Sequence, residues 1–270
     1  MISFPNCKIN SGLHILSKRE DGFHNLATFF YPLPLHDALE IIQAKKTVFT
    51  NSGLPVPGNA NDNICLKAYQ LLKKDFAELP PVKIHLHKTI PMGAGLGGGS
   101  ADGAFTLKLL NEKFDLGLST DQLINYALQL GSDCPFFIVN KPSMATGRGE
   151  ILEPLPIDLS AYKFVIVNPG IHINTGWAFS QITPAPPKKS IKQIIVQPIE
   201  TWKQELKNDF EEPVFKNHSE IKSIKEELYK QGAVYASMSG SGSTVYGIFK
   251  KEIELSFNFP AHYFVKELHS

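Results

Sequence analysis

Cysteine is scarce in this chain, and its three cysteines lie far apart. Cys7, Cys65 and Cys134 are odd in number and include no CxxC pair. A disulfide framework needs an even set of cysteines, and a zinc site needs closely spaced cysteine or histidine ligands. We therefore expect free thiols in a reduced compartment, which favours a cytoplasmic location.

Long apolar runs and an excess of either charge are also missing. No segment approaches the roughly 18 apolar residues that cross a bilayer, and the N-terminus MISFPNCKIN lacks the apolar core of a signal peptide. The 27 basic and 26 acidic residues give a formal net charge of +1. Since no overall field attracts nucleic acid or an anionic membrane, we expect neither as a partner, and a phosphorylated small molecule must be recognised locally.

The chain is long enough for two domains that mix strands and helices. Its 270 residues, 43% of them hydrophobic, can bury a substantial core. Residues 3–50 have the pattern of short strands, and glycine and proline are frequent between residues 147 and 156. We expect an α+β fold with an N-terminal domain over 1–155 and a C-terminal domain over 156–270.

The most informative stretch is the glycine-rich segment Pro91–Gly103. Residues 82–87 alternate apolar and polar side chains, which predicts a strand with one buried face before it. Ser100 is expected to cap a helix after it. Glycines between a strand and a helix N-terminus allow positive φ, remove Cβ atoms and expose N–H groups to an anion. The segment therefore predicts a phosphate-binding loop.

A flexible turn or a different class of nucleotide loop could also produce a glycine-rich segment. Gly93, Gly95 and Gly98 satisfy the dinucleotide pattern GxGxxG, but the preceding strand is half polar, unlike the buried strand of a Rossmann unit. A Walker A loop requires a lysine before its serine, and here Gly99 precedes Ser100 directly. A dinucleotide-dependent oxidoreductase and a non-catalytic nucleotide-binding module stay open as alternatives.

The glycine segment resembles the nucleotide loop of the GHMP kinases, the superfamily of galactokinase, homoserine kinase and mevalonate kinase. Four further motifs resemble, in order, those of the branch whose acceptor is a cytidine diphosphate-linked methylerythritol. They are PNCKIN (Pro5–Asn10), DGFHNL (Asp21–Leu26), GSDCPFF (Gly131–Phe137) and SMSGSGST (Ser237–Thr244). Another GHMP kinase would need both glycine-containing segments but not PNCKIN together with DGFH.

The resemblance implies a fold and a reaction. The fold is a two-domain GHMP kinase, with an N-terminal ribosomal-protein-S5-like domain, a C-terminal α/β sandwich domain and an active site in the cleft between them. The reaction is ATP-dependent phosphorylation of a hydroxyl of the cytidine diphosphate-linked substrate. Mg²⁺ is expected because the polyphosphate charge must be neutralised during transfer. The sequence identifies no protein ligand for the metal and no oligomeric state.

Two residues are implied to be catalytic by the same resemblance. Asp133 corresponds to the catalytic base, and Lys8 lies in the family's PxxKxN pattern. Without the resemblance, Asp133 could instead cap a helix that has Pro135 in its first turn, and Lys8 could be a solvated lysine.

The resemblance also implies an ATP-binding set and a substrate-binding set. The ATP-binding set is Pro91, Met92, Gly93, Ala94, Gly95, Leu96, Gly97, Gly98, Gly99, Ser100, Ala101, Asn63, Lys88, Ser239 and Gly240. Lys88 could alternatively be a strand-edge charge, and the turn that contains Ser239 and Gly240 could be only a hairpin tip.

The substrate-binding set is Asn10, Phe23, His24, Thr175 and Phe179. Phe23 and Phe179 are expected to sandwich the cytosine while His24 reads its edge, since aromatic faces stack bases. Phe23 stands where the family commonly has tyrosine, so a phenolic hydroxyl is lost. Both phenylalanines could alternatively belong to the core.

Helix caps and loops complete the predictions. Asn61 or Asp62 is expected to cap a helix, and Ser119 with Gln122 forms a capping box for a helix that Gly131 ends. Asn174 is expected to cap a short helix, and the proline-rich residues 183–190 to form a surface loop.

Overall fold

The computed structural model describes residues 1–59 and 62–269, and the chain divides into two compact units. Unit 1 consists of Met1–Cys7, Leu35–Met92 and Gly97–Lys141; unit 2 consists of Lys8–Pro34, Gly93–Leu96 and Pro142–Ser270. Because the units interleave along the chain, no single cut separates them. The domain boundary near residue 155 stays a prediction.

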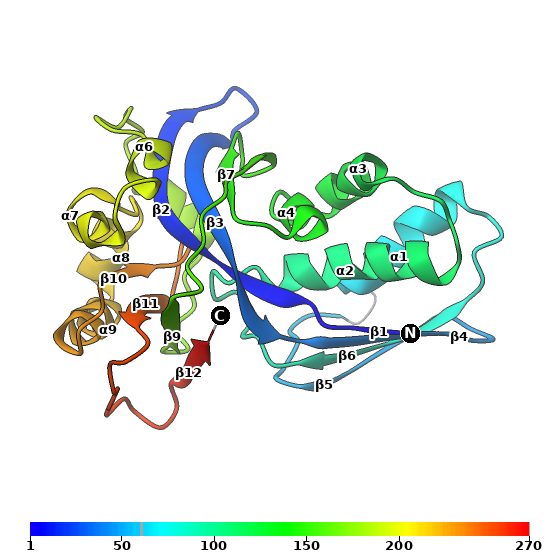
Figure 1. Ribbon diagram of the computed structural model, residues 1–270. Coiled ribbons are helices and arrows are strands. Elements are labelled where there is room, and N and C mark those ends of the chain that lie inside the picture. Colours follow the sequence, from blue (N-terminus) through cyan, green and yellow to red (C-terminus); the bar gives the residue numbers. More distant parts are fainter. Residues whose placement is uncertain (60–61, 270) are drawn as a thin grey trace. The chain divides into compact units, whose positions relative to one another are not determined.

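Unit 1 is a four-stranded sheet with helices packed on it. The strand order is β1 (Ile2–Ser3), β4 (Ala38–Gln43), β6 (Val82–Lys88) and β5 (Val48–Gly53). Only β5 runs parallel to its neighbour β6; the other two pairs in this sheet are antiparallel. The helices of this unit are α1 (Ile64–Asp75), α2 (Gly98–Lys113), α3 (Thr120–Leu130) and α4 (Cys134–Val139). In Figure 1, α1 and α2 lie along one face of this sheet.

Apolar and polar side chains alternate along β6, and this alternation determines which face of the strand is buried. Val82, Ile84 and Leu86 are buried, and the polar residues between them are more exposed. The strand predicted over residues 82–87 is therefore confirmed, with one buried face. Burying large aliphatic side chains contributes about 1.5–3 kcal/mol each, so this face stabilises unit 1.

The helix starts of unit 1 correct two predictions. Helix α2 begins at Gly98 after a left-handed cap residue, Gly97 (φ 71°), so Ser100 is the third helical residue rather than the cap. A left-handed backbone favours glycine, and here it starts the helix earlier than a serine cap would. Helix α1 is capped by Asn63, whose side chain accepts from the Cys65 N–H at 2.9 Å. Asp62 therefore precedes the cap, and Asn61 lies outside the described residues.

Two other predicted caps are confirmed. Ser119 and Gln122 form the capping box of α3, and Gly131 is its C-cap. Asn174 caps α5 (Thr175–Ser180) by accepting from the Trp177 N–H at 2.8 Å. These signals are local in sequence, so neighbouring elements have little influence on them.

Unit 2 contains two further four-stranded sheets. One has the order β2 (Asn6–Lys18), β3 (His24–His36), β7 (Ser143–Thr146) and β8 (Ile151–Pro154). The other has the order β10 (Tyr235–Met238), β11 (Val245–Lys250), β9 (Tyr162–Asn168) and β12 (Phe264–His269). The expectation of short strands is wrong for β2 and β3, which have 13 residues each. The first residues of β2 and the last of β3 belong to unit 1.

The helices of unit 2 are short except for α9, and they complete its core. They are α5, α6 (Ile191–Ile195), η2 (Ile199–Thr201), α7 (Trp202–Glu205), α8 (Glu211–Asn217) and α9 (Ser219–Lys230). Core residues come from β2, β9, β10, β11 and α9 together, including Leu13, Val167 and Ile224. Residues 183–190 form an irregular, partly exposed loop as predicted.

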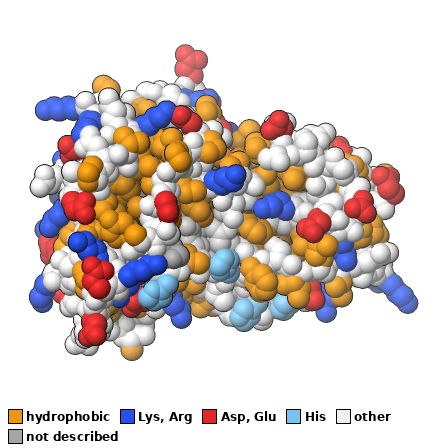
Figure 2. Space-filling view, in the orientation of Figure 1, with side chains coloured by type: hydrophobic (Ala, Val, Ile, Leu, Met, Phe, Trp, Pro, Cys, Tyr) orange, Lys and Arg blue, Asp and Glu red, His pale blue; other side chains and the backbone are white. Residues whose placement is uncertain are grey.

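The surface charge, the helices and the cysteines can each be compared with what the composition predicts. On the face seen in Figure 2, basic and acidic side chains are interspersed with apolar ones. Within residues 1–59 and 62–269, no helix is both long and apolar enough to span a membrane. The thiols of Cys7, Cys65 and Cys134 are free and buried, as expected.

Candidate functional site

The glycine loop uses its glycines in two different ways. Gly93, Gly95 and Gly97 have φ values of 65°, 78° and 71°, a region that favours glycine. Gly98 and Gly99 are instead the first two residues of α2, so the expectation of positive φ is wrong for them. Gly98 is required for space, because a Cβ there would lie 2.8 Å from Ile90 Cγ2.

The serine-glycine turn between β10 and β11 packs against the part of this loop that belongs to unit 2. Ser239 Oγ donates to the Gly95 carbonyl at 2.8 Å, and Thr244 N–H donates to the Ala94 carbonyl at 3.3 Å. A Cβ on Gly95 would lie 2.0 Å from the Ser239 carbonyl oxygen. Asn208 Nδ2 donates at 2.8 Å to the carbonyls of both Met238 and Gly240. The turn is therefore both a hairpin and a support for the glycine loop, and its role in binding ATP stays a prediction.

Lys8 is fixed within unit 2 rather than solvated. Its residue is 3% exposed, and its Nζ donates to Asn10 Oδ1 at 2.5 Å and to the Gly95 carbonyl at 3.2 Å. The same ammonium lies 4.8 Å from the centre of the Phe30 ring, and the backbone N–H of Lys8 donates to the Leu96 carbonyl at 2.9 Å. A buried, oriented ammonium is suited to stabilising charge at a fixed place.

Asn10 orients that ammonium. Its Nδ2 donates to Thr28 Oγ1 at 3.0 Å, and its backbone N–H donates to Ser239 Oγ at 3.1 Å. These bonds leave Oδ1 directed at Lys8, so the structure gives Asn10 a positioning contact. Its contact with substrate stays a prediction.

Asp133 lies at the start of α4 in unit 1. It occupies the cap position and Pro135 follows in the first turn, but its side chain makes no capping hydrogen bond to the helix. The adjacent thiol of Cys134 is buried, and burial raises its pKa to about 12, so it is a neutral neighbour at physiological pH. Helix α4 is otherwise apolar, and its Phe136 and Phe137 are fully buried. The backbone that carries Asp133 is therefore rigidly anchored.

A cavity of about 400 Å³ lies within unit 1 beside the start of α2. Four residues of the predicted ATP-binding set line it, namely Asn63, Met92, Gly99 and Ser100. The remaining lining residues are Phe49, Asn51, Val56, Pro57, Gly58, Asn59, Asp62, Ile64, Leu86 and Asp102. Walls that mix apolar and polar side chains beside a glycine-started helix suit a nucleoside and its phosphates.

A buried ion cluster, Asp37–Lys88–Asp102, adjoins this cavity. Lys88 Nζ donates to Asp37 Oδ2 and, at 2.9 Å, to Asp102 Oδ2. Asp37 Oδ1 also accepts the backbone N–H groups of Thr89 at 2.6 Å and Ile90 at 2.9 Å. The three side chains are almost completely buried. The cluster therefore fixes the end of β6 to the first turns of α2.

The cluster changes the interpretation of Lys88. Strand β6 lies between β4 and β5, so Lys88 is not a strand-edge charge. Burial opposes its charge, but Asp102 and Asp37 together outweigh burial and raise its pKa. Burial raises the pKa of Asp102 to about 8, and repulsion by Asp37 adds to the effect although Lys88 opposes it. Any role of Lys88 in binding adenine stays a prediction.

The predicted base-binding residues lie in unit 2, but the aromatic contacts differ from a simple Phe23–Phe179 pair. Among the described residues, Phe179 stacks on His24, with ring centres 4.8 Å apart and planes at 15°. Phe210 meets the Phe179 ring edge-on at 4.9 Å. Phe23 is 53% exposed, and the guanidinium of Arg148 lies 5.0 Å from its ring centre. The cytosine sandwich stays a prediction.

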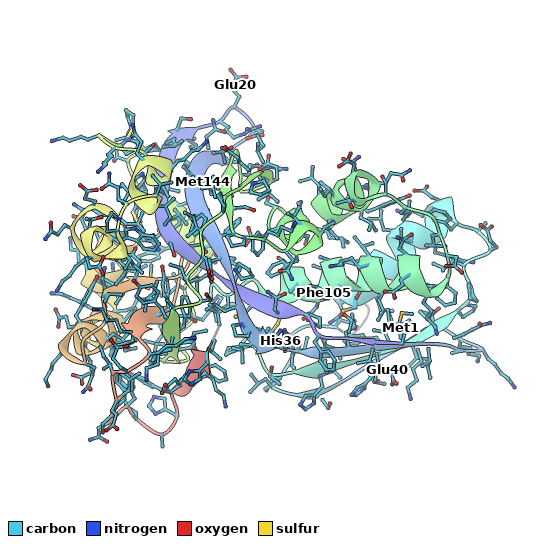
Figure 3. All side chains as sticks on the ribbon, viewed as in Figure 1. Met1, Glu20, His36, Glu40, Phe105 and Met144 are labelled. Carbon is cyan, nitrogen blue, oxygen red and sulfur yellow. The ribbon has the colours of Figure 1, made fainter. Side chains whose placement is uncertain are left out.

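Phe23 belongs to an exposed hairpin connection. Figure 3 shows Glu20 projecting from the tip between β2 and β3, and Phe23 follows three residues later. Asp21 Oδ1 accepts the Phe23 N–H at 3.1 Å, and Gly22 has a φ of 83°. The fifth predicted substrate residue, Thr175, has its hydroxyl 3.1 Å from that of Ser241 in the serine-glycine turn.

Four residues with structural roles around these sites, Asp37, Asp102, Arg148 and Asn208, were not predicted from the sequence. Asp102 carried the clearest signal, because an aspartate among the small residues of Gly98–Ala104 is unusual for a packed helix face. Asp37, Arg148 and Asn208 act through contacts that are distant in sequence. Among the described residues, no group of three or more metal-ligating side chains is assembled.

Comparison with known proteins identifies the family of this arrangement. The model of the GHMP kinases N terminal domain matches residues 63–141, and the model of the GHMP kinases C terminal domain matches residues 190–256. The 4-diphosphocytidyl-2-C-methyl-D-erythritol kinase of Azobacteroides pseudotrichonymphae genomovar. CFP2 is 51% identical over 268 residues, 98% of this chain and 100% of the relative. The enzyme of the same name from Bacteroides thetaiotaomicron is 55% identical over 256 residues, 93% of each chain.

A solved structure agrees with this match. The crystal structure of a 4-(cytidine 5'-diphospho)-2C-methyl-D-erythritol kinase superposes with a TM-score of 0.79 at 30% identity and covers 92% of this chain and 90% of its own. Similarity therefore extends across both units rather than to the glycine loop alone.

Proposed function

We propose a kinase reaction for this chain, which belongs to the GHMP kinases and, within them, to the family of the 4-diphosphocytidyl-2-C-methyl-D-erythritol kinases. The reaction is transfer of the γ-phosphoryl group of ATP to the 2-hydroxyl of 4-diphosphocytidyl-2-C-methyl-D-erythritol, which gives the 2-phosphate and ADP. This step belongs to the non-mevalonate route to isoprenoid precursors. The observation that carries the proposal is 51% identity to a kinase of that name over 98% of this chain.

The ATP-binding role is supported by the geometry of unit 1. The cavity beside α2 has apolar side chains such as Phe49 and Leu86 for a base, and it is also lined by Gly99 and Ser100 in the first turn of the helix, where backbone N–H groups have no partner within the helix. Added side chains would disrupt this helix start, since a Cβ on Gly98 would collide with Ile90. Asn63 lines the same cavity with its side chain already bound to the helix α1 backbone.

The chemical step is assigned to Asp133 and Lys8. Phosphoryl transfer depends on positioning and charge stabilisation more than on early proton removal. Asp133 would orient the acceptor hydroxyl and take its proton, while the ammonium of Lys8 offsets the developing negative charge. The burial of Lys8 and its bonds to Asn10 and Gly95 support an oriented charge.

Mg²⁺ belongs to this proposal as the ion that neutralises the polyphosphate. Mg²⁺ is usually bound through one or two carboxylates together with substrate phosphates and water, so it would accompany the nucleotide. Asp133 is the only carboxylate assigned to the chemical step, and no protein ligand is assigned to the ion.

Recognition of cytosine is assigned to the aromatic residues of unit 2. Phe23 offers an exposed ring, and the stacked His24–Phe179 pair offers a second aromatic surface with a polar edge. Stacking accepts every base, whereas a histidine edge contact can discriminate among bases. Thr175 and Asn10 would contact the remainder of the substrate.

A panel of acceptors with γ-labelled ATP tests the proposal. The cytidine diphosphate-linked methylerythritol should accept label, whereas homoserine, mevalonate and galactose should not. Efficient labelling of one of those three alcohols would instead identify another GHMP kinase activity. ATP binding without transfer to any alcohol would favour a non-catalytic module.

A further inference from the structure

The ring of Phe23 has one face covered by another side chain. Phe23 follows the tip between β2 and β3, and the residue is 53% exposed. The guanidinium of Arg148 lies over its ring, 5.0 Å from the ring centre. Because this cation covers one face, a base that stacks on Phe23 has to approach the opposite face. The contact therefore gives the ring a supported face and a face that is open to a ligand.

Arg148 is held by the tight turn between β7 and β8. Its backbone N–H donates to Glu150 Oε2 at 2.5 Å, and its Nε lies 3.6 Å from Glu150 Oε1. The turn is closed by a bond of 3.0 Å from the Gly149 N–H to the Thr146 carbonyl. Gly147 has a φ of 69°, and a Cβ there would lie 2.9 Å from the Glu150 carboxylate. Contacts other than the one with Phe23 therefore fix the position of Arg148.

The backbone on each side of Phe23 is bonded as well. The Leu26 N–H, three residues after Phe23, donates to the Gly147 carbonyl at 2.7 Å and so joins β3 to the turn that carries Arg148. Before the ring, Asp21 Oδ1 accepts the Phe23 N–H at 3.1 Å. These bonds set the distance between the two backbones, and the contact with Arg148 adds support for the ring itself.

Support for an exposed ring matters for binding because a free side chain must be ordered when a ligand binds. Exposed side chains exchange rotamers within picoseconds to nanoseconds, and ordering one of them on association reduces affinity. A ring that is already held before the ligand arrives avoids this loss. A cation over an aromatic face is weakly attractive even at an exposed site, so it favours the rotamer in which the two groups stack.

We propose that Arg148 is a positioning residue for the cytidine diphosphate-linked substrate: it supports one face of the Phe23 ring, and the opposite face receives the cytosine. This inference rests on the proposed function, because it takes Phe23 as the stacking residue. Since Arg148 acts through Phe23, its loss changes substrate affinity and leaves the chemical step and ATP binding as they are. Stacking accepts every base, so the preference for cytosine over uracil also stays the same.

Steady-state kinetics of the full chain test this assignment in two backgrounds. Arg148→Ala should raise KM for the cytidine substrate roughly 2- to 5-fold, the value of one cation–π contact at an exposed site, with kcat and the KM for ATP nearly constant. In the Phe23→Ala background the same change should leave KM unaltered, because no ring is left to support. Arg148→Lys keeps a cation and should recover part of the affinity.

A matched control and the fold are checked in the same experiment. Lys222→Ala removes an exposed cation of α9, also in unit 2, and should leave all three constants unchanged. Thermal unfolding shows whether each variant is folded. If Arg148→Ala failed to fold, Arg148→Lys in the two backgrounds would give the same comparison.

Three results would overturn the inference. An equal rise in KM with and without Phe23 would mean that Arg148 contacts the substrate directly, and an altered ratio of kcat/KM between the cytidine substrate and its uridine analogue would assign it a contact with the base edge. An unchanged KM in folded Arg148→Ala would give it no role in binding. Wild-type protein that transfers no phosphate to the cytidine substrate would instead contradict the proposed function itself.

Discussion

The cavity of unit 1 and the aromatic region of unit 2 are built for recognition in opposite ways. Around the cavity, Lys88, Asp37 and Asp102 are buried and joined to backbone N–H groups. In the aromatic region, Phe23 is 53% exposed and lies next to a hairpin tip. Ion pairs and hydrogen bonds to the backbone hold the first region in place. The second region presents Phe23 from a surface loop, and loops are in general more mobile than strands and helices.

This difference predicts how each region responds to change. A buried cluster loses stability when one member is removed, because the buried groups that were bonded to it lose a hydrogen-bond partner. An exposed aromatic side chain can be removed with little effect on the fold, so its loss should appear in substrate affinity alone. Binding and stability should therefore be coupled in unit 1 and separable in the aromatic region of unit 2.

The largest effect should come from removing the chemistry while both regions stay intact. Asp133→Asn and Lys8→Ala should each lower kcat by about 10²- to 10⁴-fold, the range for a positioned acid-base or charge-stabilising group. Their effects should not add in the double variant, because the two groups act on one step. Steady-state kinetics with folded protein checks this, and full additivity or near-normal kcat in either variant would contradict a shared role.

The second largest effect is expected on the free energy of unfolding, when the buried cluster is broken. Asp37→Ala leaves Lys88 with Asp102 as its remaining partner and the N–H groups of Thr89 and Ile90 without their acceptor, which should cost about 1–3 kcal/mol of unfolding free energy for each unpaired N–H group. Denaturant unfolding measures this cost. Glu226→Ala, which opens an exposed ion pair with Lys222, is the control and should leave the midpoint unchanged. A mild effect of Asp37→Ala would show that the cluster does not anchor α2.

Two glycines of the glycine loop should differ in how much their replacement by alanine lowers stability. Gly95→Ala places a Cβ 2.0 Å from the Ser239 carbonyl at a φ of 78°, which should cost at least about 1–3 kcal/mol of stability and weaken ATP binding. Gly99→Ala meets only Met92 at 3.6 Å, so its fold should be stable. Any loss of ATP affinity in Gly99→Ala would then come from a clash between the added methyl group and the bound nucleotide, and not from a change in the fold. Thermal unfolding together with ATP titration distinguishes the two, and equal stability would contradict the role of Gly95.

In the aromatic region, Phe23→Ala should change affinity without changing stability. Loss of one stacking contact is worth about 1–3 kcal/mol, so KM for the cytidine substrate should rise roughly 5- to 150-fold while kcat and the KM for ATP stay nearly constant. Phe4→Ala removes another exposed phenylalanine, in unit 1, and should leave all three constants unchanged. A folded Phe23→Ala enzyme with normal KM would exclude a base pocket at this position.

The smallest effect is expected from the edge contact. His24→Ala should reduce the preference for the cytidine substrate over its uridine analogue by roughly 2- to 12-fold, the value of one hydrogen bond. Because His24 also stacks on Phe179, affinity for both substrates should fall as well. The ratio of the two kcat/KM values is the measurement, and an unchanged ratio would give His24 a stacking role alone.

Local signals made much of the scaffold predictable from the sequence. The capping box at Ser119, the cap at Asn174 and the alternation on β6 involve residues close together in the chain, and all are confirmed. Ser100 failed as a cap because a left-handed glycine at 97 competes for the same helix start. When several glycines precede a serine, the sequence does not indicate which glycine adopts the left-handed conformation and so starts the helix.

The contacts that the sequence could not predict are long-range. Lys88 meets Asp37 from 51 residues away and Asp102 from 14 residues away, and only the packing of α2 on the sheet brings them together. His24 stacks on Phe179 through the fold of unit 2, and no periodicity indicates that contact. The motifs located the loop and the candidate residues, whereas tertiary packing determined which neighbours they have.

Identification of the product decides whether this chain catalyses the assigned reaction. Wild-type protein, ATP and Mg²⁺ should convert 4-diphosphocytidyl-2-C-methyl-D-erythritol to one new phosphomonoester with equimolar ADP, and phosphorus and carbon NMR should place the phosphate on the 2-hydroxyl. Asp133→Asn should form little of it under the same conditions. A phosphate on another hydroxyl would correct the orientation of the acceptor, and ADP formation without any phosphorylated cytidine product would contradict the assigned reaction.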